Sequence, residues 1–598
     1  MDSYSDRPNI LWITSEDNGP HLGSYGDANA VTPHLDALAT GGTIYLNAWS
    51  TLPVCAPART AIITGMYPSS IGAEHMRSMA LLPPGIRLFP EYLRDAGYYC
   101  TNNNKEDYNV PSNDEVWDES SRQAHWKNRK LGQPFFAVFN IGTTHESQIR
   151  RRPHTPVHDP AAVQLPAHYP DTPESRGDWA QYYDKMTEMD RAVGQRLREL
   201  EEAGLADDTI VMYYGDHGIG LPRSKRSPYN SGLRVPLIVV VPEKYRDLAP
   251  SDVGVGNMSD RLVSFVDLAP TLLRLADLEA PDNMQGKPFL GAKDLPEKEY
   301  LFGFRGRMDE RYEMIRVIRD KRFLYMKNYM PHLAHGQHVA YMFQTPSTRA
   351  WYDKFVEGTL SPEHAYFWER KAPEELYDLE ADPDEVRNLA GIPEHLERLR
   401  RMRGALEQIL EDTRDVGFVP EPDYYTVYRD RILNELAQDE EAYPLALIRK
   451  VAGMATGLRF DPSLVGYLSH RNSNVRYWAA TGVLNHEGSI EGMPIVQLRG
   501  LLDDVSPSVQ IVAAELLARH GSGEDSRSAL SILLELSDIT KQHVTVVTFA
   551  LNALDYLDEY AAPIKSEIAA LPKTSETLPN RNRNYVSDLI AKIEADLR

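Results

Sequence analysis

The sequence predicts an α/β protein built on a doubly wound sheet, with a smaller α+β subdomain and an all-α repeat region towards its C-terminal end. Short apolar runs alternate with helical patterns over the first half of the chain, which is typical of parallel strands covered by helices on both faces. A hairpin pattern follows, and beyond Pro420 the chain is almost wholly helical. We expect three domains, at residues 1–291, 292–420 and 421–598.

Five short apolar runs predict the strands of the main sheet. They span residues 9–14, 98–101, 134–141, 209–214 and 235–241. Between them, Thr32 and Pro33 suit the start of a helix, and residues 178–203 have a helical period that ends at Gly204. Strands that alternate with helices in this order favour a doubly wound sheet.

The second half of the chain contains a predicted hairpin, a strand, a helix, a linker and a set of repeats. The hairpin spans residues 314–319 and 322–328, the strand 375–380, the helix 395–412 and the linker 420–423. Residues 474–480 recur as 508–514, with a looser copy at 544–554. This period, with paired amphipathic helices, resembles HEAT-type repeats, which pack or bind partners. We expect a structural role, or the joining of chains into a homo-oligomer.

The composition is that of a soluble globular protein with an acidic surface. Charged residues make up 25% of the 598, hydrophobic ones 42%, and the formal net charge is −22. Such a charge argues against a nucleic-acid binder or a partner of anionic membranes. The start, Met1–Asp6, is polar, and no apolar run is long enough to cross a bilayer. We expect a cytoplasmic protein, or a periplasmic or secreted one if a leader has been removed.

One of only two cysteines, Cys55, lies in the run from Pro53 to Ile63. Pro57 and the small residues after it suit the first turn of a helix, so Cys55 should lie at the helix N-terminus. Free N–H groups and the helix dipole favour anions there. A buried, inert cysteine is the ordinary alternative.

Three predicted strands end in residues that bind metal ions or anions. These residues are Glu16, Asp17, His145, Asp216 and His217. Because the carboxyl ends of parallel strands meet at one edge of a sheet, we expect these side chains to converge there with Cys55. Paired carboxylates are costly unless a hard divalent cation neutralises them. The set fits metal-assisted hydrolysis of an anionic ester.

The same residues carry a resemblance to a known family. Cys55-x-Pro57-x-Arg59 resembles the sulfatase motif, whose cysteine is oxidised after translation to formylglycine (3-oxoalanine). Further blocks occur in family order: NILWITSEDNGP, NNNKEDYN, YYGDHG, YNSGLRVPLIV and ELYDLEADPDEVRNLA. The resemblance covers residues 7–415, and the blocks SED, HMRS and TTHES are most similar to sulfamidase-like enzymes (N-sulfoglucosamine sulfohydrolases).

The resemblance implies an alkaline-phosphatase-like fold and an enzyme that removes sulfate, as ester or sulfamate, from a sulfated mono- or oligosaccharide. Cys55, converted to the formylglycine hydrate by a formylglycine-generating maturation enzyme, would be the nucleophile. Arg59 and Lys105 would stabilise it, and His145 and Lys225 would hold sulfate oxygens or protonate the leaving group.

The resemblance also implies a cation, Ca2+, bound by Glu16, Asp17, Asp216 and His217. Glu16 stands where the family usually has aspartate, and His217 replaces a more frequent asparagine. An imidazole ligand makes Mn2+ more plausible, and Mg2+ is a further candidate. Asp107 occupies the place of a catalytic histidine, which leaves His145 as the candidate general acid.

The residues expected to contact the sugar are His75, Arg77, Asp107, Arg150 and the run from Arg305 to Arg311. Two alternatives to a sulfatase stay open at this point. The first is a phosphonate monoester or phosphodiester hydrolase of the same superfamily, which His217 favours. The second is a catalytically silent binding protein whose helical repeats recruit a partner.

Overall fold

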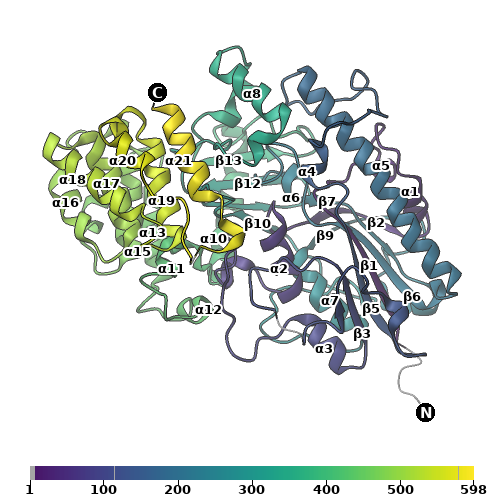
Figure 1. Ribbon diagram of the computed structural model, residues 1–598. Helices are drawn as coiled ribbons and strands as arrows, with labels where there is room; N and C mark the ends of the chain where they lie inside the picture. The colour runs from purple at the N-terminus through teal and green to yellow at the C-terminus, as the bar shows by residue number, and fades with distance from the viewer. Residues whose placement is uncertain (1–6, 113–114, 577, 598) are drawn as a thin grey trace.

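A nine-stranded mixed sheet forms the centre of the first half of the chain (Figure 1). The computed structural model describes residues 7–112, 115–576 and 578–597. The strands are β1 (Asn9–Ser15), β2 (Thr43–Trp49), β3 (Tyr99–Asn103), β4 (Glu119–Ser120), β5 (Phe135–Ile141), β6 (Thr209–Gly215), β7 (Arg234–Val235), β8 (Leu237–Val240) and β9 (Asn257–Ser264). Their order is β4-β3-β5-β1-β6-β8-β2-β7, with β9 also paired to β2.

The central strand β1 shows why this sheet is buried on both faces. Its neighbours β5 and β6 run parallel to it. Successive side chains point to opposite faces, so Ile10 and Trp12 enter one hydrophobic core, whereas Leu11 and Ile13 enter another. Such a strand must be apolar along its middle, as residues 10–13 of β1 are. The predicted doubly wound α/β fold is confirmed.

Helices cover each face of the sheet. The first core contains α2 (Cys55–Thr64), α3 (Phe89–Asp95) and α7 (Leu268–Leu275), and the second contains α1 (Pro33–Thr40) and the long α5 (Pro173–Glu202). Helix α5 begins five residues before the predicted start, because Thr172 caps it by accepting a hydrogen bond from Ser175 N at 3.0 Å. The predicted run at 235–241 is interrupted at Pro236, and the sequence reading missed β2 and β9.

A second, antiparallel sheet follows, as the hairpin pattern predicts. It contains β10 (Leu301–Arg305), β11 (Ile315–Arg319), β12 (Phe323–Asn328) and β13 (Glu374–Asp378) in that order. Helix α10 (Leu396–Asp412) contacts β11 and β12, and α8 (Pro346–Val356) contacts α5. Short helices in these parts are α4 (Glu146–Ile149), α6 (Asn230–Leu233) and α9 (Pro362–Ala365).

The last third of the chain is helical and lies beside the second sheet, at the left of Figure 1. Its helices are α11 (Glu421–Tyr424), α12 (Leu433–Leu436), α13 (Leu445–Ala455), α14 (Leu464–Tyr467), α15 (Ser473–Asn485), α16 (Ile495–Gly500), α17 (Pro507–His520), α18 (Gly523–Leu536), α19 (Val544–Tyr556), α20 (Lys565–Ala569) and α21 (Tyr585–Asp596). The three repeated segments lie in α15, α17 and α19, which contact one another in sequence order. The HEAT assignment and the domain boundaries stay predictions. No helix among the described residues has both the length and the apolar surface needed to cross a bilayer.

The predicted linker at 420–423 is instead part of a buried junction. Residues Glu421–Tyr424 form α11, and Glu421 accepts two hydrogen bonds from Arg307, at 2.5 and 2.9 Å. Asp423 accepts hydrogen bonds from the hydroxyls of Ser506 and Ser508, both at 2.7 Å. These side chains are all less than 5% exposed. The helical region is therefore fixed to the rest of the molecule by buried polar contacts.

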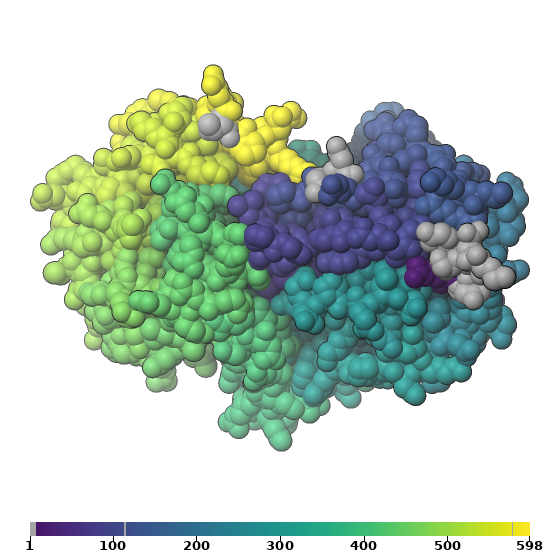
Figure 2. Space-filling model, turned by 90° about the horizontal axis from the view of Figure 1, so that it is seen from below, coloured from purple at the N-terminus to yellow at the C-terminus, as the bar shows by residue number. Residues whose placement is uncertain are grey.

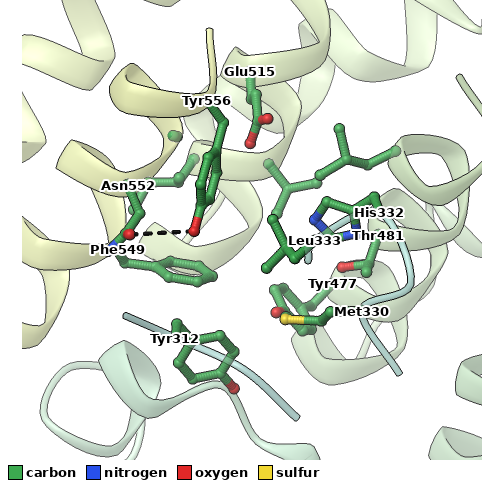
Figure 3. A pocket seen from close by; sticks show the side chains of 14 residues that line it. Tyr312, Met330, His332, Leu333, Tyr477, Thr481, Glu515, Phe549, Asn552 and Tyr556 are labelled. Carbon is green, nitrogen blue, oxygen red and sulfur yellow. Dashed lines mark hydrogen bonds between the residues drawn. The ribbon is translucent and has the colours of Figure 1, made fainter. Parts of the chain in front are cut away.

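Apolar packing adds to this junction (Figure 3). Tyr312, from the segment after β10, meets Phe549 of α19 edge to face, with ring centroids 4.9 Å apart. Nearby, Arg311 pairs with Asp555 at 2.7 Å and also donates to Asn552 at 2.8 Å. Both surfaces lose water on contact, so the helical region packs as part of one folded unit.

The Arg307–Glu421 pair should be worth several kcal/mol to the fold. Glu421→Ala leaves a buried, unpaired guanidinium, and we expect the free energy of unfolding to fall by about 3–5 kcal/mol, measured by urea denaturation. Asp247→Ala, which breaks an exposed pair with Lys293, is the control and should leave the transition midpoint unchanged. Equal effects of the two substitutions would contradict this account of the junction.

Candidate active site

Three neighbouring strands end at the same level and bring the predicted polar residues together. Ser15 at the end of β1 pairs with Ile141 of β5 and with Gly215 of β6. Each strand then leads into a loop at this edge of the sheet. Asp17 N donates to Asp216 Oδ1 at 3.0 Å, which joins the loops after β1 and β6. The predicted convergence of Asp17, His145 and Asp216 at one edge is observed.

Cys55 faces this edge from the first turn of α2. Its Sγ lies 3.4 Å from His217 Nε2 and 3.8 Å from Asp17 Oδ1. One turn further along α2, Arg59 donates to Asp216 Oδ2 at 3.0 Å and to Asn140 Oδ1 at 2.6 Å. Because Cys55 and Arg59 are four residues apart, they share a helix face. The predicted position of Cys55 at the helix N-terminus is confirmed.

Asp17, Asp216 and His217 fit a divalent cation. Their donor atoms and Cys55 Sγ all lie within 4.8 Å of one another, and the three residues are fully buried. His217 Nδ1 contacts the backbone oxygen of Gly218 at 2.9 Å and donates to it, which turns Nε2 towards Asp17 Oδ1, 2.9 Å away. Gly218 must be glycine here, because a Cβ would lie 1.9 Å from Ser231 O.

The charges in this group show how strongly it favours a cation. Burial alone would lower the pKa of His217, but the carboxylates of Asp216 and Asp17 raise it to about 10. Burial would likewise raise the pKa of Asp17, but Lys225 and His217 hold it well below its usual range. Two buried carboxylates therefore stay ionised and need positive charge beside them.

Glu16 lies apart from these three residues. Its Oε2 is 3.1 Å from Lys105 Nζ, and its carboxylate groups with Cys55 and His145 instead. Lys105 also lies 3.8 Å from Asp107. Of the four predicted metal ligands, Glu16 is thus the one that lies outside the group formed by Asp17, Asp216 and His217.

A second set of charges lies on the other side of Cys55. Lys225 Nζ is 2.6 Å from Asp17 Oδ2 and 3.2 Å from Glu146 Oε1. Arg226 forms two hydrogen bonds with Glu146, at 2.8 and 2.9 Å, and one with Asp309 at 2.7 Å. Burial would raise the pKa of Glu146, but Arg226 and Lys225 lower it to about 2. Glu146 is therefore ionised and holds both cations in place.

His145 is placed to donate a hydrogen bond while neutral. Its Nδ1 accepts from Ser147 N at 3.3 Å, so the proton of the neutral ring is on Nε2. Burial and the charge of Lys225 lower its pKa below the usual value. At neutral pH the ring is then uncharged, with one N–H available.

These groups surround a cavity of about 480 Å³. Among the predicted residues it is lined by Cys55, Arg77, Lys105, Asp107, His145 and Lys225. Asp309 and Glu310, from the predicted run 305–311, also line it. The sequence did not predict Arg226, Tyr341 or the C-terminal residues Asn580, Arg581, Arg583, Asn584, Tyr585 and Asp588, which line the cavity too. Arg226 could have been suspected from its position beside Lys225, but the C-terminal segment carries no family pattern.

Four predicted sugar contacts do not line the cavity. His75, Arg305 and Arg311 are at most 2% exposed. His75 Nδ1 accepts from Arg307 N at 2.9 Å, and Arg311 is bound to α19. Arg150 lies over the ring of Tyr341, 4.0 Å from its centroid. These four side chains hold the fold together, and we leave them out of the proposed sugar-binding set.

Comparisons with known proteins show which proteins this chain resembles. The family model described as Sulfatase matches residues 8–107 and 99–278. An ulvan-active sulfatase of Formosa agariphila is 38% identical over 496 residues, which cover 75% of this chain and 80% of that protein. Human N-sulphoglucosamine sulphohydrolase is 27% identical over 469 residues, covering 68% of this chain and 91% of that protein. The solved structure of a phosphonate monoester hydrolase from Silicibacter pomeroyi matches with a TM-score of 0.51 at 17% identity. The match covers 69% of this chain and 97% of the hydrolase chain, and at this identity it shows a similar fold alone.

The structural role of the segment around His75 can be tested through its neighbour Glu74. Burial raises the pKa of Glu74 to about 7, so the folded state binds more protons than the unfolded state between pH 4.5 and 7. Stability then falls as the pH rises through this window. Glu74→Gln removes this pH dependence, because glutamine does not titrate. The free energy of unfolding of the variant minus that of the wild type should therefore rise by about 3 kcal/mol between pH 4.5 and pH 8. A pH-independent difference in urea denaturation would contradict the assignment.

Proposed function

The chain belongs to the sulfatase family, and we propose that it removes sulfate, as ester or sulfamate, from a sulfated carbohydrate through a formylglycine at position 55. The observation that carries the proposal is the position of Cys55. It lies at a helix N-terminus between the Asp17, Asp216 and His217 group and the cations Lys105 and Lys225, at the base of one cavity.

Formylglycine at position 55 would supply, as its hydrate, the hydroxyl that attacks sulfur. Cys55 is only 4% exposed, so a maturation enzyme must reach it before α2 packs into the core. Arg59 supports this role by fixing Asp216 from the same helix face. Asp17 and His217 flank the same atom on the other side.

Asp17, Asp216 and His217 would hold a divalent cation, which would neutralise charge on the sulfate and on the nucleophile. Two carboxylates and an imidazole with a backbone-bound Nδ1 support this assignment. Glu16 is the fourth candidate ligand, once its side chain turns from Lys105. Ca2+ suits the carboxylates, and the imidazole favours Mn2+ more than an amide would.

The remaining polar groups fit a sulfate and a departing sugar. Lys105 and Lys225 carry positive charge on two sides of Cys55, where sulfate oxygens would lie. His145 would give its Nε2 proton to the oxygen or nitrogen of the leaving sugar. Because this ring is neutral at ordinary pH, the donor is already protonated at the correct nitrogen.

The substrate class rests on the relatives. The two curated proteins are named for activity on ulvan and on a sulphated glucosamine, and both are carbohydrate sulfatases by those names. The runner-up, a phosphonate monoester or phosphodiester hydrolase, shares the fold and is favoured by His217. A sulfatase should cleave an aryl sulfate faster than the matching aryl phosphonate monoester, and the opposite order would favour the runner-up.

Cys55→Ala should abolish sulfate release, a loss of at least about 10⁴-fold, because no other group can replace the nucleophile. Cys100→Ala is the control, since Cys100 is buried on β3 away from the cavity. Circular dichroism should show that both variants fold. Sulfate release by the Cys55→Ala protein, or an unmodified thiol at Cys55 in active enzyme by mass spectrometry, would overturn the proposal.

His217→Asn should change which cation restores activity. In this variant an amide oxygen replaces the imidazole nitrogen as ligand. After the metal is removed with a chelator, the ratio of the activity restored by Mn2+ to that restored by Ca2+ should fall about tenfold relative to the wild type. Asp216→Ala should lose the cation, as measured by elemental analysis of the purified protein. An unchanged Mn2+ to Ca2+ ratio in the His217→Asn protein would remove His217 from the ligand set.

A further inference from the structure

The cavity above Cys55 is closed on one side by residues from the far end of the chain. Arg581, Arg583, Asn584 and Tyr585, at and just before the start of α21, line the same cavity as Cys55. Arg77, which follows the Cys55 helix, donates to Arg581 O at 2.8 Å. Figure 2 shows the same arrangement, with the C-terminal residues (yellow) beside those of the first part of the chain (purple).

This wall is held in place by packing. Tyr585 is 5% exposed and has the guanidinium of Arg307 over its ring, 5.6 Å from the centroid. Helix α21 contacts α19, which in turn packs on Tyr312 of the segment after β10 (Figure 3). The wall therefore belongs to the folded body and has one defined position relative to Cys55.

Two side chains on the wall have no partner among the residues that the structure describes. Arg583 is exposed, and its side chain makes no ion pair or hydrogen bond with another residue in the described part of the chain. The hydroxyl of Tyr585 is buried and also has no hydrogen-bond partner among the described residues. A buried hydroxyl in this state costs free energy, so its presence in a cavity indicates a group that binds there from outside.

The charges divide the cavity into an inner and an outer part. Near Cys55, Lys225 and Arg226 are each paired with buried carboxylates. On the wall, the carboxylate nearest to Arg581 is that of Asp107, at 3.9 Å, and Asp588 also lines the cavity. Asp309 and Glu310 line the cavity as well, so Arg583 is the wall cation that no carboxylate among the described residues pairs with.

We propose that Arg583 and Tyr585, with Arg77 beside them, form a subsite for a second acidic group on the sugar substrate, a uronate carboxylate or another sulfate. The proposal rests on the sulfatase function proposed above. The guanidinium fork matches either anion with two parallel hydrogen bonds, and the tyrosine hydroxyl adds a third donor. A cavity of about 480 Å³ is within the usual range for small ligands, so both acidic groups can lie in it together.

The subsite would make the helical region a determinant of specificity. Sulfated glycans that carry a second charge near the cleaved sulfate would bind better than those that do not. The motif that supplies these groups, Asn580-Arg-Asn-Arg-Asn584, is locally basic within an acidic chain.

The test uses matched ligands and binding to the full-length Cys55→Ala protein, so that it does not depend on turnover. The first probe is a disaccharide with one sulfate and one uronate carboxylate, and the second is its methyl ester. A third probe carries a second sulfate in place of the uronate and identifies which acid is preferred. Isothermal titration calorimetry should give a dissociation constant about tenfold lower for the probe with the free carboxylate than for its methyl ester.

Arg583→Ala should remove this preference for the acid, and Tyr585→Phe should reduce it severalfold, without a matching loss for the ester. Arg527→Ala, an exposed arginine of α18 outside the cavity, is the control and should keep the wild-type preference. Equal affinity of the Cys55→Ala protein for acids and ester, or a preference that survives in Arg583→Ala, overturns the subsite. Absence of sulfate release by the wild type, with the preference intact, would instead overturn the proposed function.

Discussion

The arrangement of this protein depends on two buried carboxylates, Asp17 and Asp216, at the ends of neighbouring parallel strands. Their loops are joined by a hydrogen bond from Asp17 N to Asp216 Oδ1. Both groups are fully buried, and each needs positive charge beside it. Arg59 and Lys225 supply part of it from two different segments, and His217 lies 2.9 Å from Asp17 Oδ1. Helix α2 is held at this edge for the same reason, and with it Cys55.

The same requirement extends outward from the strand ends. Lys225 lies between Asp17 and Glu146, and Arg226 carries the chain of charges on to Asp309. Beyond Asp309, the cavity is closed by the C-terminal segment. Charged groups near Cys55 are thus paired and fixed, whereas Tyr585 on the C-terminal wall has a buried hydroxyl with no partner among the described residues. A rigid centre beside a wall that can bind further groups suits an enzyme that cleaves one bond within a larger anionic substrate.

The sequence predicted the features that depend on local pattern. The apolar runs identified β1, β5 and β6, and their polar ends led to Asp17, His145 and Asp216. Features that depend on distant partners were not predictable in this way. His75 and Arg311 resembled surface ligands, but their partners lie in the segments at Arg307 and Asp555. The run at 420–423 resembled a linker because nothing local indicates that Arg307 neutralises Glu421. The C-terminal wall was missed because its approach to Cys55 is set by the packing of α19 and α21.

The central claim is that the group around Cys55 cleaves sulfate from a sugar. The most direct measurement is free sulfate, detected by ion chromatography, after incubation of the purified, metal-loaded enzyme with a panel of defined sulfated saccharides. The account predicts stoichiometric sulfate release from at least one member of the panel, which includes O-sulfated and N-sulfated sugars. No sulfate from any member, with formylglycine verified at position 55 and the cation bound, would contradict it.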